Sequence, residues 1–456
     1  MEISYLKRFG SRIRTKLNGI KRPVDIASKE LGIEKNILEK CLSGELEKEK
    51  VLEIISNINK IYPIKISEIY LEEDTTVDGV VYCSNQQTLK SKRIICRKNK
   101  DNLETEYYSY YDCAMDKNCP FKPELIEILR EVNDKDPNNL DVAYNRGHLE
   151  TQMTFYINKV NFYYEVNNKK ILNETNSFDS SIKLPYIPHT FTNRDKSINS
   201  KIIAVTFSNN IALNSSNLSY IPYDGLNEVS GDLRNTGDLF TKRLQRYLDK
   251  NLLNKDLLIE KLSTLYEKDE IDKYFSSYNN KNNQTNLSIN EFICDYLNIN
   301  KSDLEFNKLE ESKEVIFKEF DNIYHKINNL QVNKLATSEF IKDATSFNIK
   351  LNSSNLEEMN LNLFQSSYYQ FIYNYSDSSF LFKWGDKLQN EKIIGSGDSL
   401  VIMPFVKHLF EFISEGAQFY LAKVSGVLNE SILNEFSSFD VKNKNRLCDK
   451  ENDKWW

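Results

Sequence analysis

The sequence predicts an α+β protein in which a helical segment and a β-rich segment each occur twice along the chain. Apolar residues recur at helical spacing over residues 1–75 and again over 216–312. Short alternating segments separated by turn residues fill 76–215, and mixed segments followed by strands fill 313–456. The order helical, β, helical, β indicates an internal duplication.

The composition is that of an ordinary water-soluble protein. A chain of 456 residues with 40% apolar and 28% charged residues is long enough for about two to four domains. The net charge of -6 argues against nucleic acid as the main partner. The sequence shows no signal peptide and no apolar run that could cross a bilayer, and its seven cysteines lack zinc or redox spacing. We therefore expect a cytoplasmic protein with reduced thiols and no membrane partner.

Residues 1–75 are expected to form a helical module of the helix-turn-helix type. Apolar residues at helical spacing lie between Val24 and Ile33, Gly32 marks a turn, and a second helix is expected from Asn36 to Leu42. This second helix mixes acidic and basic side chains, whereas a DNA-reading helix is expected to be rich in basic and amide side chains. The pattern favours a role in packing or assembly.

The first β-rich segment has the pattern of a β-sandwich or barrel. Alternation along its aromatic strand sends Tyr108, Tyr110 and Asp112 to one face. The strands expected in this segment cover residues 80–82, 93–96, 107–111, 154–156, 160–164 and 202–207.

The second half of the chain repeats this order. Leucines at helical spacing precede an expected loop over 276–286, and strands are expected at 369–375, 380–384 and 399–403. Its β-rich segment carries His408 without a partner, so it is interpreted as a copy without metal. His325 is assigned to a helical stretch, as a surface or packing residue.

Two of the four histidines, His148 and His189, belong to the first β-rich segment. If residues 148–155 form a strand, His148, Glu150 and Gln152 share one face. With His189 arriving from a neighbouring strand, that face would carry two imidazoles and an oxygen donor, the ligand set of a mononuclear non-haem iron site. Alternation cannot choose between Glu150 and Gln152. A lone histidine on a strand is more often a core or surface group.

The motifs Asn145-x-Gly147-His148-Leu149-Glu150 and Pro185-Tyr186-x-Pro188-His189-Thr190-Phe191 resemble a family of iron oxygenases of phosphonate metabolism. This family includes methylphosphonate synthases and hydroxyethylphosphonate dioxygenases. The resemblance covers nearly the whole chain. It implies a tandem repeat of a helix-turn-helix-like module and a cupin β-barrel, the second cupin being degenerate, with limits at 1–75, 76–215, 216–312 and 313–456.

The two kinds of enzyme differ in the third iron ligand. The dioxygenases have a glutamate six residues before the second histidine, where this chain has Lys183, a cation that does not bind iron. The synthases have a glutamine four residues after the first histidine, where Gln152 stands. The resemblance thus implies that His148, Gln152 and His189 hold Fe(II). A neutral amide in place of a carboxylate leaves more positive charge on the iron for an anionic substrate.

The resemblance also implies roles for other residues. Asn145, Tyr110 and Arg97 match positions that bind the phosphonate, and a guanidinium fits two of its oxygens. Lys21 matches a lysine that reaches the active site from a neighbouring subunit, which implies a homo-oligomer, a dimer or tetramer. Tyr110 and Lys21 are the expected catalytic residues. A serine that contacts the phosphonate in the dioxygenases is Ala204 here.

The implied reaction is an Fe(II)- and O2-dependent cleavage of the C–C bond of 2-hydroxyethylphosphonate, giving methylphosphonate and CO2. No 2-oxoglutarate or pterin is expected, because the substrate supplies all four electrons. One alternative is the dioxygenase reaction, which gives hydroxymethylphosphonate and formate. The other is a transcription regulator with a helix-turn-helix fused to a ligand-sensing cupin, which would bind specific DNA without turnover.

Overall fold

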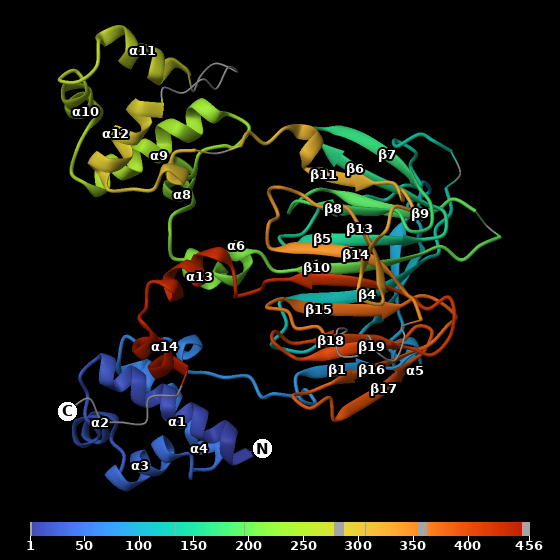
Figure 1. Cartoon of the computed structure of the whole chain (residues 1–456), viewed down its shortest axis with the longest axis horizontal. Coiled ribbons are helices and arrows are strands. Elements are labelled where there is room, and N and C mark those ends of the chain that lie inside the picture. Colours follow the sequence, from blue (N-terminus) through green and yellow to red (C-terminus); the bar gives the residue numbers. More distant parts are fainter. Residues whose placement is uncertain are drawn as a thin grey trace.

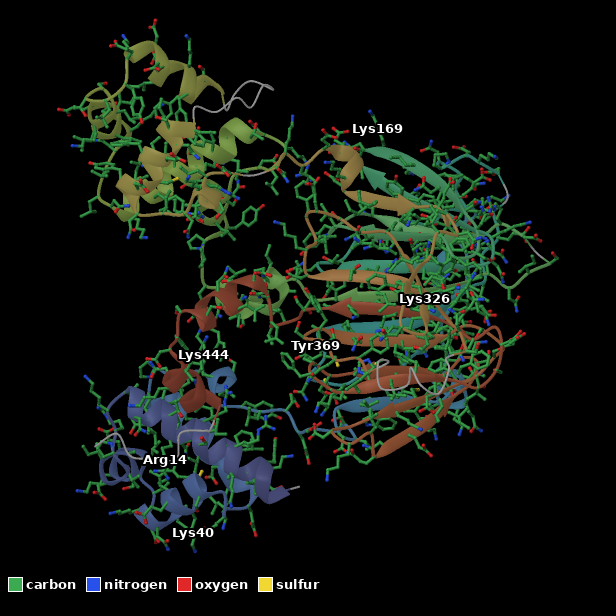
Figure 2. The ribbon with its side chains drawn as sticks, in the orientation of Figure 1. Arg14, Lys40, Lys169, Lys326, Tyr369 and Lys444 are labelled. Carbon is green, nitrogen blue, oxygen red and sulfur yellow. The ribbon has the colours of Figure 1, made fainter. Side chains whose placement is uncertain are left out.

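The computed structural model describes residues 2–132, 134–195, 197–277, 287–305, 307–353 and 363–448. Figure 1 shows two helical groups, one blue and one yellow-green, on one side of a body made of strands. Charged side chains such as Lys40 and Lys169 project from both the helical and the β-rich parts (Figure 2). Within the described residues, no helix is long and apolar enough to cross a membrane.

The first helical group confirms the predicted helix-turn-helix pattern. Its helices are α1 (Glu2–Gly19), α2 (Val24–Leu31), α3 (Lys35–Ser43) and α4 (Lys48–Ile61), followed by the short η1 (Ile66–Glu68). Gly32 ends α2 in the left-handed conformation, with φ 66°. The apolar faces of these helices, including Phe9, Leu38 and Ile58, form a core of their own.

The second helical group is also confirmed. After the short α6 (Asn210–Leu213) and α7 (Ser215–Leu218), it contains α8 (Tyr223–Ser230), α9 (Thr236–Lys250), α10 (Lys255–Leu262), α11 (Lys268–Ser277) and α12 (Leu287–Leu297). The periodic leucines of the sequence, among them Leu244, Leu248 and Leu258, form its core. Of the loop expected over 276–286, residues 278–286 lie outside the described residues. The short η2 (Lys301–Asp303) and η3 (Glu311–Lys313) lead into the next strand.

The described strands form four antiparallel sheets. One seven-stranded sheet has the order β11-β8-β5-β10-β4-β3-β2, and a three-stranded sheet of order β7-β6-β9 accompanies it. The strands of the larger sheet are β2 (Arg93–Lys98), β3 (Glu104–Asp112), β4 (Phe121–Ile128), β5 (Thr151–Ile157), β8 (Ser180–Lys183), β10 (Lys201–Phe207) and β11 (Val315–Lys318). Those of the smaller sheet are β6 (Val160–Val166), β7 (Lys169–Thr175) and β9 (His189–Asn193).

The other two sheets repeat this arrangement, with the orders β1-β18-β15-β20-β14-β13-β12 and β17-β16-β19. Each large sheet ends on a strand from the other half of the chain, because β1 pairs with β18 and β11 pairs with β8. The strands are β1 (Val80–Cys83), β12 (His325–Ile327), β13 (Leu330–Lys334), β14 (Ala344–Leu351), β15 (Tyr369–Asn374), β18 (Ser399–Ile402) and β20 (Gln418–Val424), with β16 (Phe380–Trp384), β17 (Asn390–Ile394) and β19 (His408–Phe412). The remaining helices are α5 (Asn85–Lys90), α13 (Glu430–Ser437) and α14 (Val441–Cys448).

The assignment of His325 to a helical stretch is wrong. His325 begins β12. It is exposed, which agrees with its prediction as a surface residue. The strand turns into β13 through Asn328 and Asn329, and Asn328 has φ 55°. Asparagine tolerates this left-handed conformation, so a two-residue hairpin turn forms where helical spacing was inferred.

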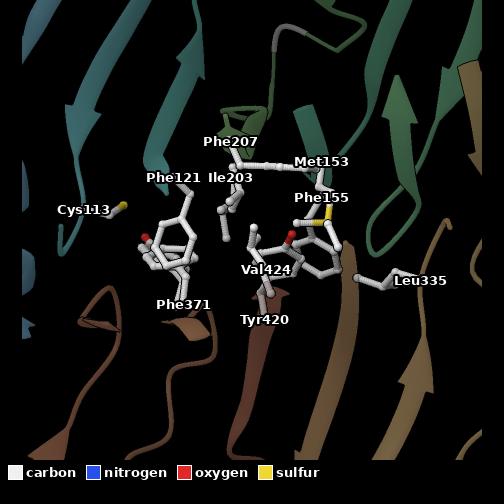
Figure 3. Packing of buried hydrophobic residues seen from close by; sticks show 14 of the residues in the cluster. Cys113, Phe121, Met153, Phe155, Ile203, Phe207, Leu335, Phe371, Tyr420 and Val424 are labelled. Atoms are coloured by element: carbon white, nitrogen blue, oxygen red, sulfur yellow. The ribbon is translucent and has the colours of Figure 1, made fainter. Parts of the chain in front are cut away.

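The two large sheets share a hydrophobic core. Figure 3 shows Phe121, Phe155 and Ile203 of the first sheet packed near Phe371 and Tyr420 of the second. Side chains alternate along a strand, so the neighbours of Phe155 on β5 face the opposite way. That opposite face, together with the β7-β6-β9 sheet, encloses a second core and the candidate site.

Candidate metal centre

The first histidine lies in an irregular segment just before a strand and not on the strand itself. Strand β5 begins at Thr151, so the predicted strand over 148–155 is wrong at its start, and alternation does not place His148 or Glu150. Gly147 has φ 74°, and a Cβ there would lie 2.4 Å from the carbonyl carbon of Tyr186. The backbone N–H of Tyr186 donates to the carbonyl of His148 over 2.7 Å. This close approach of two backbone segments fixes the position of His148.

Replacing Gly147 with alanine is expected to destabilise the protein by roughly 2 kcal/mol or more, because the left-handed backbone and the contact with Tyr186 both oppose a Cβ. Thermal unfolding measures the change. Gly225→Ala is the matched control, since a Cβ at that helical position meets nothing within 4 Å. Equal stability of the two variants would contradict the prediction.

The second histidine belongs to the facing sheet. His189 begins β9, which pairs with β6, so it reaches the site from the smaller sheet and not from a strand beside β5. Its Nδ1 donates to the carbonyl of Ile187 over 2.9 Å, which leaves the Nε2 lone pair for another partner. Asn145 supports this residue twice: its Oδ1 accepts from the backbone N–H of His189 over 2.9 Å, and its Nδ2 lies 3.2 Å from Nε2.

Gln152 and Lys183 meet the first histidine at one ring nitrogen. The Nε2 of His148 lies 3.1 Å from Oε1 of Gln152 and 3.1 Å from Nζ of Lys183. The amide of Gln152 donates through Nε2 to the hydroxyl of Thr154, so its oxygen is the atom turned toward His148. Glu150 lies on the other side of the ring, 3.6 Å from Nδ1, and its side chain is 41% exposed.

Burial controls the charge of the site. Burial, and secondly the charge of Lys183, lower the pKa of His148, and they lower the pKa of His189 well below its usual value. Burial also lowers the pKa of Lys183 to about 7. Both imidazoles are therefore neutral at neutral pH, which is the form that binds a metal.

A cavity of about 340 Å³ opens beside these groups. Seven of its lining residues were singled out from the sequence: Tyr110, Asn145, His148, Glu150, Gln152, His189 and Ala204. Tyr110 also packs edge-on against Tyr108, with ring centroids 5.8 Å apart. The structure thus brings together the three candidate ligands and two of the candidate substrate contacts.

Arg97 and Lys21 lie elsewhere. The guanidinium of Arg97 lies 5.0 Å from the ring centroids of both Tyr107 and Tyr108 and donates to the hydroxyl of Thr190 over 3.0 Å. It supports the strand that carries His189 and is not part of the cavity lining. Lys21 is an exposed residue between α1 and α2 in the first helical group and does not line this cavity.

Sequence reasoning missed several lining residues, including Lys122, Glu124, Phe191 and Thr206. Burial raises the pKa of Glu124, whose carboxylate accepts from Arg93 over 2.9 Å. Thr206 lies directly across the strand pair from Gln152, as Lys183 does on the other side. Thr206, Gln152 and Lys183 therefore form a row across three strands. This row is visible only from the pairing of β5 with β10 and β8, and the sequence carries no signal for that register.

The second half of the chain holds an incomplete copy of the site. Gln370 occupies the place of Gln152 in the strand order, and His408 begins β19 as His189 begins β9. His408 also donates through Nδ1 to a carbonyl two residues earlier, over 2.9 Å. In the place of His148 stands Ser366, whose carbonyl accepts from the backbone N–H of Phe405. One imidazole is therefore missing from this copy.

No family model matches the chain. The methylphosphonate synthase of Nitrosopumilus maritimus (strain SCM1) is 30% identical over 452 residues, which cover 97% of this chain and 94% of that protein. The chain belongs to the methylphosphonate synthase family. This confirms the predicted family and the prediction of an enzyme.

Solved structures of related enzymes share the fold of this methylphosphonate synthase family member. A Streptomyces albus hydroxyethylphosphonate dioxygenase with 2-hydroxyethylphosphonate and Fe(II) bound matches with a TM-score of 0.85 and 19% identity over the whole of both chains. A variant of 2-hydroxyethylphosphonate dioxygenase matches with a TM-score of 0.73 and 15% identity over 98% of this chain and 99% of that one. The predicted mixture of helical and β-rich segments is therefore confirmed, and the sheets are antiparallel.

Proposed function

We propose that this protein is an Fe(II)- and O2-dependent oxygenase that converts 2-hydroxyethylphosphonate and O2 to methylphosphonate, CO2 and water. Family membership supports the reaction, and the dioxygenase of the same fold binds this phosphonate and Fe(II). The observation that carries the proposal is the convergence of His148, Gln152 and His189 on one cavity.

These three residues would hold the iron, and their surroundings fit that task. Both imidazoles are neutral, Nδ1 of His189 is fixed by a carbonyl, and the Gln152 amide is fixed by Thr154. Within the described part of the chain, no three His, Cys, Asp or Glu side chains are placed to hold one metal ion. We assign the third position to Gln152 and not to Glu150, because Glu150 faces Nδ1 of His148. Bound Fe(II) would supply the activation of O2.

The cavity offers groups suited to a small phosphonate. The hydroxyl of Tyr110 and the amide of Asn145 are at its wall, and we propose that both contact the phosphonate. We further propose a homo-oligomer, a dimer or tetramer, in which Lys21 reaches the cavity of a neighbouring subunit. The contacts of Arg97 favour a role in positioning β9 over direct contact with the substrate.

We also propose that the fold is a tandem repeat with limits at 1–75, 76–215, 216–312 and 313–456, the second cupin being degenerate. The matching strand orders of the two pairs of sheets support it, as does the incomplete copy of the site around His408. The exchange of β1 and β11 between the two large sheets joins the halves into one body.

The reaction is tested with purified protein loaded with Fe(II) without oxygen, then mixed with 2-hydroxyethylphosphonate and O2. Phosphorus NMR is expected to show methylphosphonate as the main product, without 2-oxoglutarate or a pterin. Samples without O2 are the control. Hydroxymethylphosphonate as the main product would move the assignment to a dioxygenase, and iron-loaded protein without turnover would contradict the proposal.

A further inference from the structure

Lys183 is a buried amine with a single side-chain hydrogen-bond partner in the described part of the chain. It is 2% exposed and ends β8, directly across from Gln152. Its Nζ lies 3.1 Å from Nε2 of His148. Among the described residues no carboxylate forms an ion pair with it. A buried amine in such surroundings is costly unless it donates hydrogen bonds.

The iron and Lys183 would both bind the same atom, Nε2 of His148. When Nδ1 of His148 carries the ring proton, Nε2 offers one lone pair; it faces Nζ of Lys183 and Oε1 of Gln152, and of these two Lys183 is the donor. When a metal binds to Nε2, Lys183 loses its partner. In its present position Glu150 cannot replace His148 as the partner of Lys183, because the Glu150 carboxylate lies beside Nδ1, on the other side of the imidazole ring. The loaded site therefore has to offer Nζ another acceptor.

The phosphonate is an acceptor of the right kind. It is an anion with three oxygens, and the cavity that would hold it is lined by His148 and by Gln152, which pairs with Lys183 across the strands; Lys183 itself is not a lining residue. Ala204 of this cavity has no hydroxyl to donate. The four-carbon stem of a lysine lets Nζ turn from the imidazole to a neighbouring oxygen without a change in the backbone.

We propose that Lys183 is a positioning residue that donates to the imidazole of His148 in the empty site and to the phosphonate in the loaded site. This inference rests on the proposed function. The metal alone costs Lys183 its hydrogen bond, whereas metal and phosphonate together restore one. Each ligand therefore raises the affinity for the other, and by linkage the two factors are equal. Couplings of this kind are typically about 5- to 150-fold.

The test is a titration with Mn(II), which binds sites of this type, without O2 and at one pH, in the presence and absence of 2-hydroxyethylphosphonate. In the unmodified protein the phosphonate is expected to raise Mn(II) affinity at least about tenfold. In Lys183→Met, Mn(II) alone is expected to bind more tightly than to the unmodified protein, and the coupling factor is expected to fall at least about fivefold. Lys183→Gln, which keeps a polar side chain, is titrated in parallel and is expected to behave as Lys183→Met does.

The matched control is Lys423→Met, which removes a half-buried lysine that lies across from Gln370 in the other large sheet. It is expected to leave the coupling factor unchanged. An unchanged coupling factor in both Lys183 variants, or a loss of Mn(II) binding in them, would overturn the inference while leaving the proposed function intact. If the unmodified protein showed no Mn(II) binding that depends on His148, the proposed function itself would fail.

Discussion

His189→Ala is expected to abolish iron binding and turnover. His189 is 4% exposed, its Nε2 borders the cavity, and its Nδ1 is held by the carbonyl of Ile187, so no neighbouring group can take its place. The loss of an outer partner of a metal ligand already costs roughly 10- to 100-fold in affinity, and loss of the ligand itself should cost more. Iron content after anaerobic loading and phosphorus NMR of the products measure both effects.

The second half of the chain provides a matched control for this variant. His408 begins the corresponding strand and has the same hydrogen bond to a backbone carbonyl, and Ser366 stands where a partner imidazole would be needed. His408→Ala is expected to keep the iron and to lower the thermal stability, because the ring packs against Phe364 and Phe382 in a buried core. Retention of iron by His189→Ala, or its loss from His408→Ala, would contradict the assignment of the site.

Much of this site could be predicted from side chains alone. Few histidines occur in the chain, and two of them fall in one β-rich segment beside oxygen donors. Both histidines line one cavity, with ring centroids 5.5 Å apart. Helical spacing likewise predicted both helical groups, because it depends only on local periodicity.

The parts that depend on contacts between distant segments could not be predicted. His148 lies outside strand β5, where Gly147 packs against Tyr186, nearly forty residues later, and alternation carries no information about such a contact. The exchange of β1 and β11 is hidden for the same reason, since a strand looks the same whichever sheet it joins. The resemblance implied that Arg97 binds the substrate, but its guanidinium lies 5.0 Å from the ring centroids of both Tyr107 and Tyr108.

Gln152 and Glu150 are the two oxygen donors between which strand alternation could not decide. Their places around His148 now differ: the Gln152 oxygen is 3.1 Å from Nε2, and the Glu150 carboxylate is 3.6 Å from Nδ1. If Gln152 is the third ligand, removing its side chain removes a metal bond. If Glu150 does not bind the metal, it only orients the imidazole ring of His148, which does.

Gln152→Ala is therefore expected to lower metal affinity by more than about 100-fold, whereas Glu150→Gln, which alters an outer partner, is expected to lower it by about 100-fold at most. Gln152→Glu separates the ligand role from the charge. It keeps an oxygen donor, so metal is expected to bind, but the added negative charge repels the phosphonate. A carboxylate about 5 Å from one phosphonate charge costs roughly 3 kcal/mol at an effective dielectric constant of 20, and Lys183 across the strand pair offsets part of it.

The affinity for 2-hydroxyethylphosphonate is thus expected to fall more than about tenfold in Gln152→Glu, measured by titrating the Mn(II)-loaded variant without O2. The same change in Lys183→Met protein is expected to weaken phosphonate binding further, since no cation then offsets the carboxylate. An unchanged affinity for the phosphonate would mean that the side chain at 152 does not face the bound substrate. A larger loss of metal from Glu150→Gln than from Gln152→Ala would instead make the carboxylate the third ligand and the amide its support.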